Sequence, residues 1–145
     1  MSNDVKITDN TDELLAGLLL KEEKALVTVG MEAEGDAKIE IESSPRRVDT
    51  GRLRNSITWA IKTKHSSPQY IGGDGADEVD PDSGVREDQV PDEKTVVIGT
   101  NVEYAAKIHE GDADEGLDPN RFLRNAVENN AQKYREIIDD TLKEE

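Results

Sequence analysis

The chain has 145 residues and carries 33 acidic against 18 basic side chains, which gives a net charge of −15. This length suits one domain, and the acidic excess argues against a protein that wraps nucleic acid or lies on an anionic membrane. Only 34% of the residues are hydrophobic and none is cysteine. The chain therefore has no disulfide or thiolate site, and we expect a thin core that neighbouring subunits help to complete.

A long helix is predicted over residues 11–43. The Thr11 hydroxyl can cap the free backbone amides of a first turn, and apolar residues then recur at helical spacing. Pro45 predicts the end of this helix, because the residue before a proline avoids helical geometry. Two glycines weaken the middle of the helix, and residues 27–29 could instead form a strand.

Residues 1–10 are expected to form a flexible N-terminus. They lack the basic start and the apolar stretch of a signal peptide. The longest apolar run, residues 14–20, is far shorter than the roughly 20 residues that cross a membrane. These features predict a soluble protein that is not secreted.

Two strands are predicted in the middle of the chain. Residues 57–63 alternate between two faces and are rich in branched and aromatic side chains, as in a half-buried strand. Residues 94–99, Lys-Thr-Val-Val-Ile-Gly, form a second candidate that ends at a glycine. We expect the two strands to pair as a ribbon, with a long acidic excursion between them.

The negative charge is concentrated in two segments. Residues 74–93 contribute −8 and residues 110–118 contribute −5, together −13 of the −15. The first segment contains Gly and Pro, the second contains Gly, and both lack apolar periodicity, which predicts exposed loops or partly disordered insertions. The acidic residues of the first segment are Asp74, Asp77, Glu78, Asp80, Asp82, Glu87, Asp88, Asp92 and Glu93.

Three explanations of this acidity stay open: a surface adapted to high salt, a wall that repels passing DNA, or a cation site. Glu78, Asp80 and Asp82 alternate as in a calcium loop. However, Ser83 stands where the sharp turn needs glycine, and Gln89 stands where a bidentate Glu is needed. A helix-loop-helix calcium site is therefore not expected.

A short helix is predicted over residues 102–110. Tyr104, Ala105 and Ile108 would form its apolar side, and Gly111 would close it.

The last helix is predicted to begin at Asp118-Pro119, with the acid as cap and proline in the first turn. Its apolar stripe is interrupted by the polar residues 128–133. We therefore predict an α+β domain with a small, mainly antiparallel sheet, packed by long N-terminal and C-terminal helices.

No enzymatic site assembles in the sequence. Gly-x-Ser-x-Gly is absent, and neither His65 nor His109 has a second metal ligand at a suitable spacing. His109 beside Glu110 could transfer protons, although a polar helix end is the commoner role of such a pair. We expect no catalysis, no cofactor and no metal.

Two separated segments carry a resemblance to known proteins. The first is Val-Asp-Thr-Gly-Arg-Leu-Arg-Asn-Ser-Ile, residues 48–57, after a long helix and a Pro-containing linker. The second contains Ile-Gly-Thr-Asn-Val-Glu-Tyr-Ala (98–105), Ile-His-Glu-Gly (108–111) and Pro-Asn-Arg-Phe-Leu-Arg-Asn-Ala (119–126). In this order they resemble the neck and tail-completion family of siphovirus-type tailed phages, whose members include minor tail components. The likeness covers residues 45–138 apart from the acidic excursion.

The resemblance implies a virion structural protein of the head-tail connector, or one that completes the tail, assembled in the host cytoplasm. Family members act as rings, so it implies association with copies of itself and with other neck, head-completion, tail-tube or tail-terminator proteins. DNA would pass through the ring without specific binding. An acidic lining would suit such a conduit, because phosphates are repelled from the wall.

The resemblance and the local pattern give a set of candidate turn and interface residues. Asp49-Thr50-Gly51 can form a tight turn, and Leu53 would face the core. Arginines near the turn could pair with acids of a neighbouring subunit, and the single Phe is either a core residue or a plug into the next subunit. The full set is Asp49, Thr50, Gly51, Arg52, Leu53, Arg54, Ser56, Tyr104, His109, Glu110, Gly111, Arg121 and Phe122.

A small acidic regulatory module that mimics nucleic acid is the alternative function. A monomer that inhibits a DNA-binding protein would favour mimicry, whereas a ring-sized particle would favour the neck. A carboxylate hydrolase is a weaker third possibility.

Overall fold

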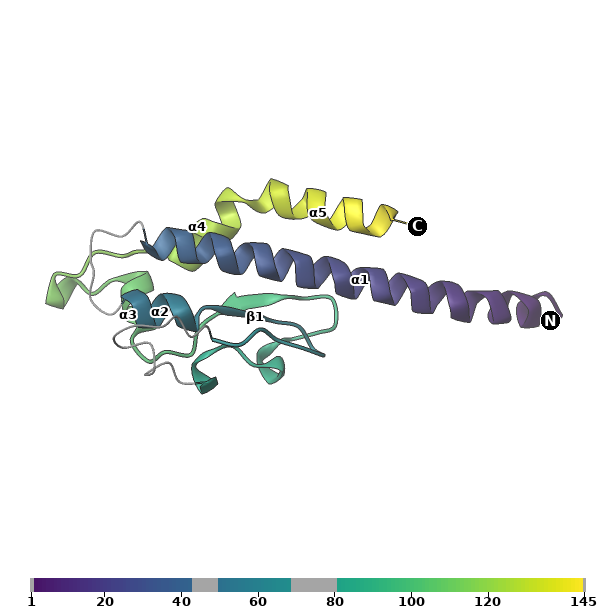
Figure 1. Ribbon diagram of the computed structural model, residues 1–145, viewed down its shortest axis with the longest axis horizontal. Coiled ribbons are helices and arrows are strands. Elements are labelled where there is room, and N and C mark those ends of the chain that lie inside the picture. The colour runs from purple at the N-terminus through teal and green to yellow at the C-terminus, as the bar shows by residue number, and fades with distance from the viewer. Residues whose placement is uncertain (1, 43–49, 69–80, 145) are drawn as a thin grey trace.

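The computed structural model describes residues 2–42, 50–68 and 81–144. The longest helix, α1 (Ser2–Glu42), lies between two layers (Figure 1). On one side are α4 (Phe122–Asn129) and α5 (Ala131–Lys143), and on the other are α2 (Thr50–Ser56), α3 (Ala105–Glu110) and a sheet of β1 (Thr58–Ala60) and β2 (Val97–Gly99). The 3-10 turns are η2 (Pro81–Ser83), η3 (Glu87–Gln89) and η4 (Ala113–Glu115). The predicted α+β class is confirmed.

The two predicted strands pair with each other. They are antiparallel, with Trp59 opposite Ile98 in the register. Both strands are shorter than expected. The second begins at Val97 and not at Lys94, and the first ends early because the chain reverses after Ala60. In this reversal the Ile61 amide donates to the Lys64 carbonyl at 2.8 Å and the Ser66 amide donates to the Trp59 carbonyl at 2.9 Å.

Helix α1 begins at Ser2, well before the predicted start at Thr11. Residues 2–10 contain neither proline nor glycine, so nothing in their backbone chemistry stops the helix. Residues 27–29 are helical, which excludes the strand alternative. Helix α1 is described as far as Glu42, and the predicted end at residue 43 lies outside the described residues. The flexibility expected for residues 1–10 stays a prediction.

One face of α1 carries a stripe of buried, mostly small side chains at every fourth position. This spacing keeps the stripe on one face, and the small residues let neighbouring elements approach closely. At Gly30, a Cβ atom would lie 2.9 Å from the Trp59 ring, so only glycine fits under β1. The stripe consists of Ala25, Val29, Ala33, Ala37 and Ile41.

Within the described ranges, no helix combines the length and apolar character needed to cross a membrane.

The single last helix predicted from Asp118-Pro119 is wrong in two respects. It begins at Phe122, and it is divided into α4 and α5 at Asn130, which has φ −118° and ψ 13°. The Asn130 side-chain amide donates to the Ala126 carbonyl at 2.8 Å, which satisfies an acceptor at the break. The division falls inside the polar stretch 128–133.

The largest core cluster lies where the C-terminal end of α1 meets α2, α3 and α4. A second cluster joins α1 to Tyr134 of α5, and a third lies between β1 and residues 85–90. The members of the first cluster are Ala37, Ile41, Leu53, Ile57, Val102, Ala105, Phe122 and Ala126.

The described part of the acidic excursion is not an exposed, irregular loop. Val85 and Val90 are buried against Ala60. The Val85 amide donates to Thr58 Oγ1 at 2.8 Å, and the Asn101 amide donates to the Ser83 carbonyl at 2.6 Å. The two valines anchor the segment to the sheet, while most of its acidic side chains stay in solvent.

Candidate functional site

The first segment of the resemblance, residues 48–57, contains α2 and ends directly before β1. Thr50, Gly51 and Arg52 belong to the helical backbone of α2, so the expected tight turn is wrong for Thr50 and Gly51. Asp49 lies outside the described residues. Leu53 is fully buried, as predicted.

A pair of hydroxyl groups joins the first motif to the second. Ser56 Oγ donates to the Leu53 carbonyl at 2.6 Å and lies 2.6 Å from Thr100 Oγ1. Thr100 Oγ1 in turn accepts from the Val102 amide at 3.0 Å. Ser56 is fully buried, so it fixes the end of α2 against the chain after β2 and cannot contact a partner.

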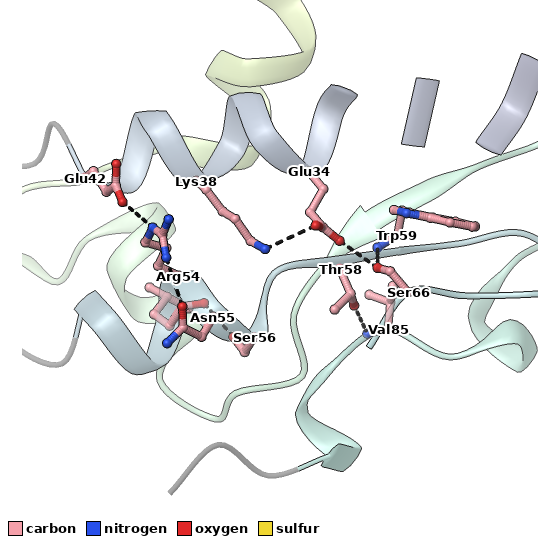
Figure 2. A network of polar contacts seen from close by, with 11 residues as sticks. Glu34, Lys38, Glu42, Arg54, Asn55, Ser56, Thr58, Trp59, Ser66 and Val85 are labelled. Atoms are coloured by element: carbon pink, nitrogen blue, oxygen red, sulfur yellow. Dashed lines mark hydrogen bonds and ion pairs between the residues drawn. The ribbon is translucent and has the colours of Figure 1, made fainter. Parts of the chain in front are cut away.

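Arg54 forms an ion pair with an acidic residue of its own chain. Its guanidinium pairs with Glu42 at the end of α1 and donates to Asn55 Oδ1 at 3.0 Å (Figure 2). This ion pair ties α2 to α1 on the two sides of the linker. The pairing expected between Arg54 and a neighbouring subunit stays a prediction.

A polar network lies beneath α1, and the sequence analysis did not predict it. Lys38 is 6% exposed and its Nζ lies 3.1 Å from the Glu34 carboxylate, which also accepts from Ser66 Oγ at 2.6 Å. Ser66 Oγ accepts from the Trp59 amide at 3.0 Å (Figure 2). The network locks α1 over β1. Its only sequence signal is the Glu-Lys spacing of four residues on α1.

Two motifs of the second segment, residues 108–111 and 119–126, meet at His109. Its Nε2 accepts from the Arg124 amide at 3.3 Å, so the proton of the neutral ring is on Nδ1, which lies 2.8 Å from Glu110 Oε1. The ring also stands edge-on to Phe122, with centroids 5.3 Å apart. Because the N-cap residue Arg121 gives α4 no side-chain hydrogen bond, His109 supplies the cap from another helix.

The environment of Glu110 favours its ionised form. The hydrogen bond from His109 holds the pKa of Glu110 below its usual range, and Arg121 Nε lies 3.7 Å from its carboxylate. These contacts are partly exposed and within one chain. They describe a polar helix end, and the possibility that His109 and Glu110 transfer protons stays untested.

The turn after α3 is mostly exposed, as predicted for residues 110–118, and it is held by specific contacts. Gly111 has φ 80°, and a Cβ atom there would lie 2.8 Å from the Leu117 carbonyl oxygen. The Asp112 carboxylate caps η4 by accepting from the amides of Asp114 and Glu115 at 3.0 and 3.4 Å. Residues 110–118 contain no basic side chain, but Lys107 from α3 pairs with Glu115 at 2.9 Å and with Asp112 at 3.3 Å. These ion pairs compensate part of the negative charge of the segment.

A groove of about 480 Å³ opens between β2, α3 and α4. Its walls are mainly apolar, and Val127 at its edge is 43% exposed. Phe122 forms part of the lining but is itself fully buried, so it is a core residue and not a plug into a neighbour. The groove is lined by Ile98, Thr100, Ala105, Ala106, His109, Glu110, Phe122, Leu123, Arg124 and Val127.

Five of the nine acidic residues predicted to face a channel or solvent are described: Asp82, Glu87, Asp88, Asp92 and Glu93. Asp88 pairs with Arg86 at 3.1 Å. Hydrogen bonds from the Thr95 hydroxyl and the Lys94 amide hold the pKa of Asp92 below its usual range. Within the described ranges no three His, Asp or Glu side chains are placed to hold a metal ion. Asp74, Asp77, Glu78 and Asp80 lie outside the described residues.

Comparisons with known proteins give no match: no family model, no curated protein and no solved structure matches this chain. The resemblance to the neck family and the expectation of no catalysis therefore stay predictions.

Proposed function

We propose that this protein is a structural component of the neck of a tailed virus, acting as a ring of identical subunits between head and tail. The observation that supports the proposal is the convergence of the two resembling segments on the largest core cluster. Leu53 comes from the first segment, and Ala105 and Phe122 come from two motifs of the second. Segments whose order and spacing suggested one family thus build one structural unit.

The small apolar content of the subunit supports a role as one part of an assembly. Three of the five side chains in the buried stripe of α1 are alanine, so each contributes little apolar area. Large apolar side chains also remain on the surface, among them Leu20, Met31 and Ile39, each more than 60% exposed. Burial of such surface by neighbouring copies would stabilise the assembled form.

The acidic excursion fits a passage for DNA in this proposal. Its described acids extend from a segment that is anchored to the sheet by Val85 and Val90, so their negative charge has a fixed place on the subunit. A wall of fixed negative charge repels phosphates and lets DNA slide without binding.

The experiment that tests the proposal measures the assembly of the purified full chain. Native mass spectrometry and electron microscopy should show closed rings at micromolar and higher concentration. An image reconstruction of the ring should place Asp82, Asp88 and Glu93 on its inner wall. Acids on the outer wall would remove the conduit but leave the ring, and a monomer that inhibits a DNA-binding protein would favour the acidic mimic.

A further inference from the structure

Two layers of the protein stop at the same point along α1. At the end of α5, Glu144 pairs with Lys24 at 2.5 Å. At the tip of the turn after β1, Lys64 pairs with Glu23 at 2.7 Å. Figure 1 shows α1 continuing past both of these ends to the N-terminus.

The part of α1 before this point, residues 2–22, is named the arm here. At about 1.5 Å per residue it is about 30 Å long. Its sequence continues the stripe that is buried within the domain: Leu18 lies about two turns before Ala25, and Leu15 lies one turn earlier. The apolar pattern therefore extends beyond the elements that bury it.

The groove between β2, α3 and α4 lies at the other end of the molecule. Ala105 and Phe122, which line it, pack in the same cluster as Ile41 at the C-terminal end of α1. Figure 1 places α3 and the N-terminus at opposite ends of the long axis. Because α1 is one continuous helix, the arm cannot turn back into the groove of its own chain.

Charge also matches the arm to the groove. The arm holds five acidic and two basic residues, a net charge of −3. The groove and the start of α4 carry Arg124 and Arg121, and both residues are exposed. Glu110 also lines the groove and lies 3.7 Å from Arg121, so these three side chains have a net charge of +1. An acidic helix with an apolar stripe is complementary to an apolar groove that has arginines at its edge.

We propose that the arm of one copy lies in the α3–α4 groove of a second copy. The assignment rests on the proposed function in one respect, which is that the protein associates with itself. Each subunit gives an arm at one end and receives one at the other, and such a head-to-tail contact closes into a ring when the rotation per subunit permits.

Cysteine cross-linking tests this contact directly, because the natural chain has no cysteine. The Leu18→Cys protein is mixed with the Val127→Cys protein and oxidised. A disulfide-linked pair of the two variants is expected. Ala16→Cys is the matched control, since Ala16 faces about 200° away from Leu18 on the helix, and it should link to Val127→Cys much less.

A second measurement uses two variants of equal charge. Leu18→Asp should weaken self-association at least about tenfold, because the proposed contact would then bury a carboxylate in place of a leucine, whereas Ala16→Asp should leave it nearly unchanged. Circular dichroism and the unfolding midpoint of both variants should match those of the unmodified chain, since the arm lies outside the packed domain.

The results of these experiments distinguish the arm-in-groove proposal from the proposal that the protein forms a ring. Rings that form without a Leu18→Cys to Val127→Cys link, or with Leu18→Cys linked to itself, overturn the arm-in-groove contact and leave the proposed function standing. A chain that stays monomeric at all concentrations overturns both.

Discussion

The two ends of the packed part of α1 are held by different forces. At the C-terminal end, Ile41 packs with fully buried Leu53 and Phe122. At the other end, Lys24 pairs with Glu144 through side chains that are 60% and 52% exposed. Burial of large apolar side chains contributes several kcal/mol, whereas an exposed ion pair contributes about 0–1 kcal/mol. The first end therefore holds the domain together, and the second end marks where the arm begins.

The largest effect is expected for Phe122→Ala at the apolar end. Phe122 is fully buried in the largest core cluster, so the loss of its ring leaves a cavity among Leu53, Ala105 and Ala126. The free energy of unfolding should fall by about 3–5 kcal/mol in urea denaturation. Phe122→Leu should lose less, and a loss below about 1 kcal/mol for the alanine variant would show that this cluster is not the main core.

An intermediate effect is expected for Tyr134→Phe, midway along α1. The Tyr134 hydroxyl donates to Asp36 at 2.7 Å, and Lys133 Nζ pairs with the same carboxylate at 2.8 Å. Removal of the hydroxyl should lower the free energy of unfolding by about 1 kcal/mol at neutral pH, because Lys133 still compensates Asp36. A loss as large as that of Phe122→Ala would mean that the polar contacts matter as much as burial.

The same tyrosine predicts a pH dependence. Burial, and then the hydrogen bond to Asp36, raise the pKa of Tyr134 above its ordinary value. The unfolded chain releases this proton above about pH 10 while the folded chain retains it, so stability is present below that pH and falls as the pH rises. Tyr134→Phe should remove part of the alkaline loss. Lys133, whose pKa is raised mainly by Asp36, acts in the same direction and accounts for a remainder.

A smaller effect is expected at the cap between α3 and α4. His109→Ala removes the acceptor for the Arg124 amide and the edge-on contact with Phe122, and should cost about 1–2 kcal/mol. His109→Gln offers another acceptor and should restore part of this loss. Equal losses in the two variants would show that the ring contact with Phe122, and not the cap, is what matters.

The smallest effect is expected at the end where the arm begins. Lys24→Ala and Lys64→Ala should each change the free energy of unfolding by less than about 0.5 kcal/mol, because both pairs are largely exposed. Hydrogen exchange should show faster opening of the last turn of α5 in Lys24→Ala. A change of several kcal/mol would contradict the contrast between the two ends.

Much of the candidate site was predictable from local patterns. Tyr104, Ala105 and Ile108 pack against the core as their spacing indicated, and Gly111 has the positive φ expected of a residue that closes a helix. The start of α4 was not predictable in this way. Asp118 and Pro119 offer a good local start, but the helix begins where a side chain from α3 meets its free amide.

Local patterns were enough to predict the helical and strand periods, because these depend on residues a few positions apart. The pairing of β1 with β2 was expected from the two strand patterns, although the strands lie about forty residues apart. That Val85 and Val90 anchor the acidic excursion, and that Lys38 is buried beside Glu34, became visible in the folded chain alone. The tertiary structure also decided that α1 extends beyond the elements that cover it. A periodic pattern defines which face of an element is apolar, but what covers that face depends on segments that are distant in sequence.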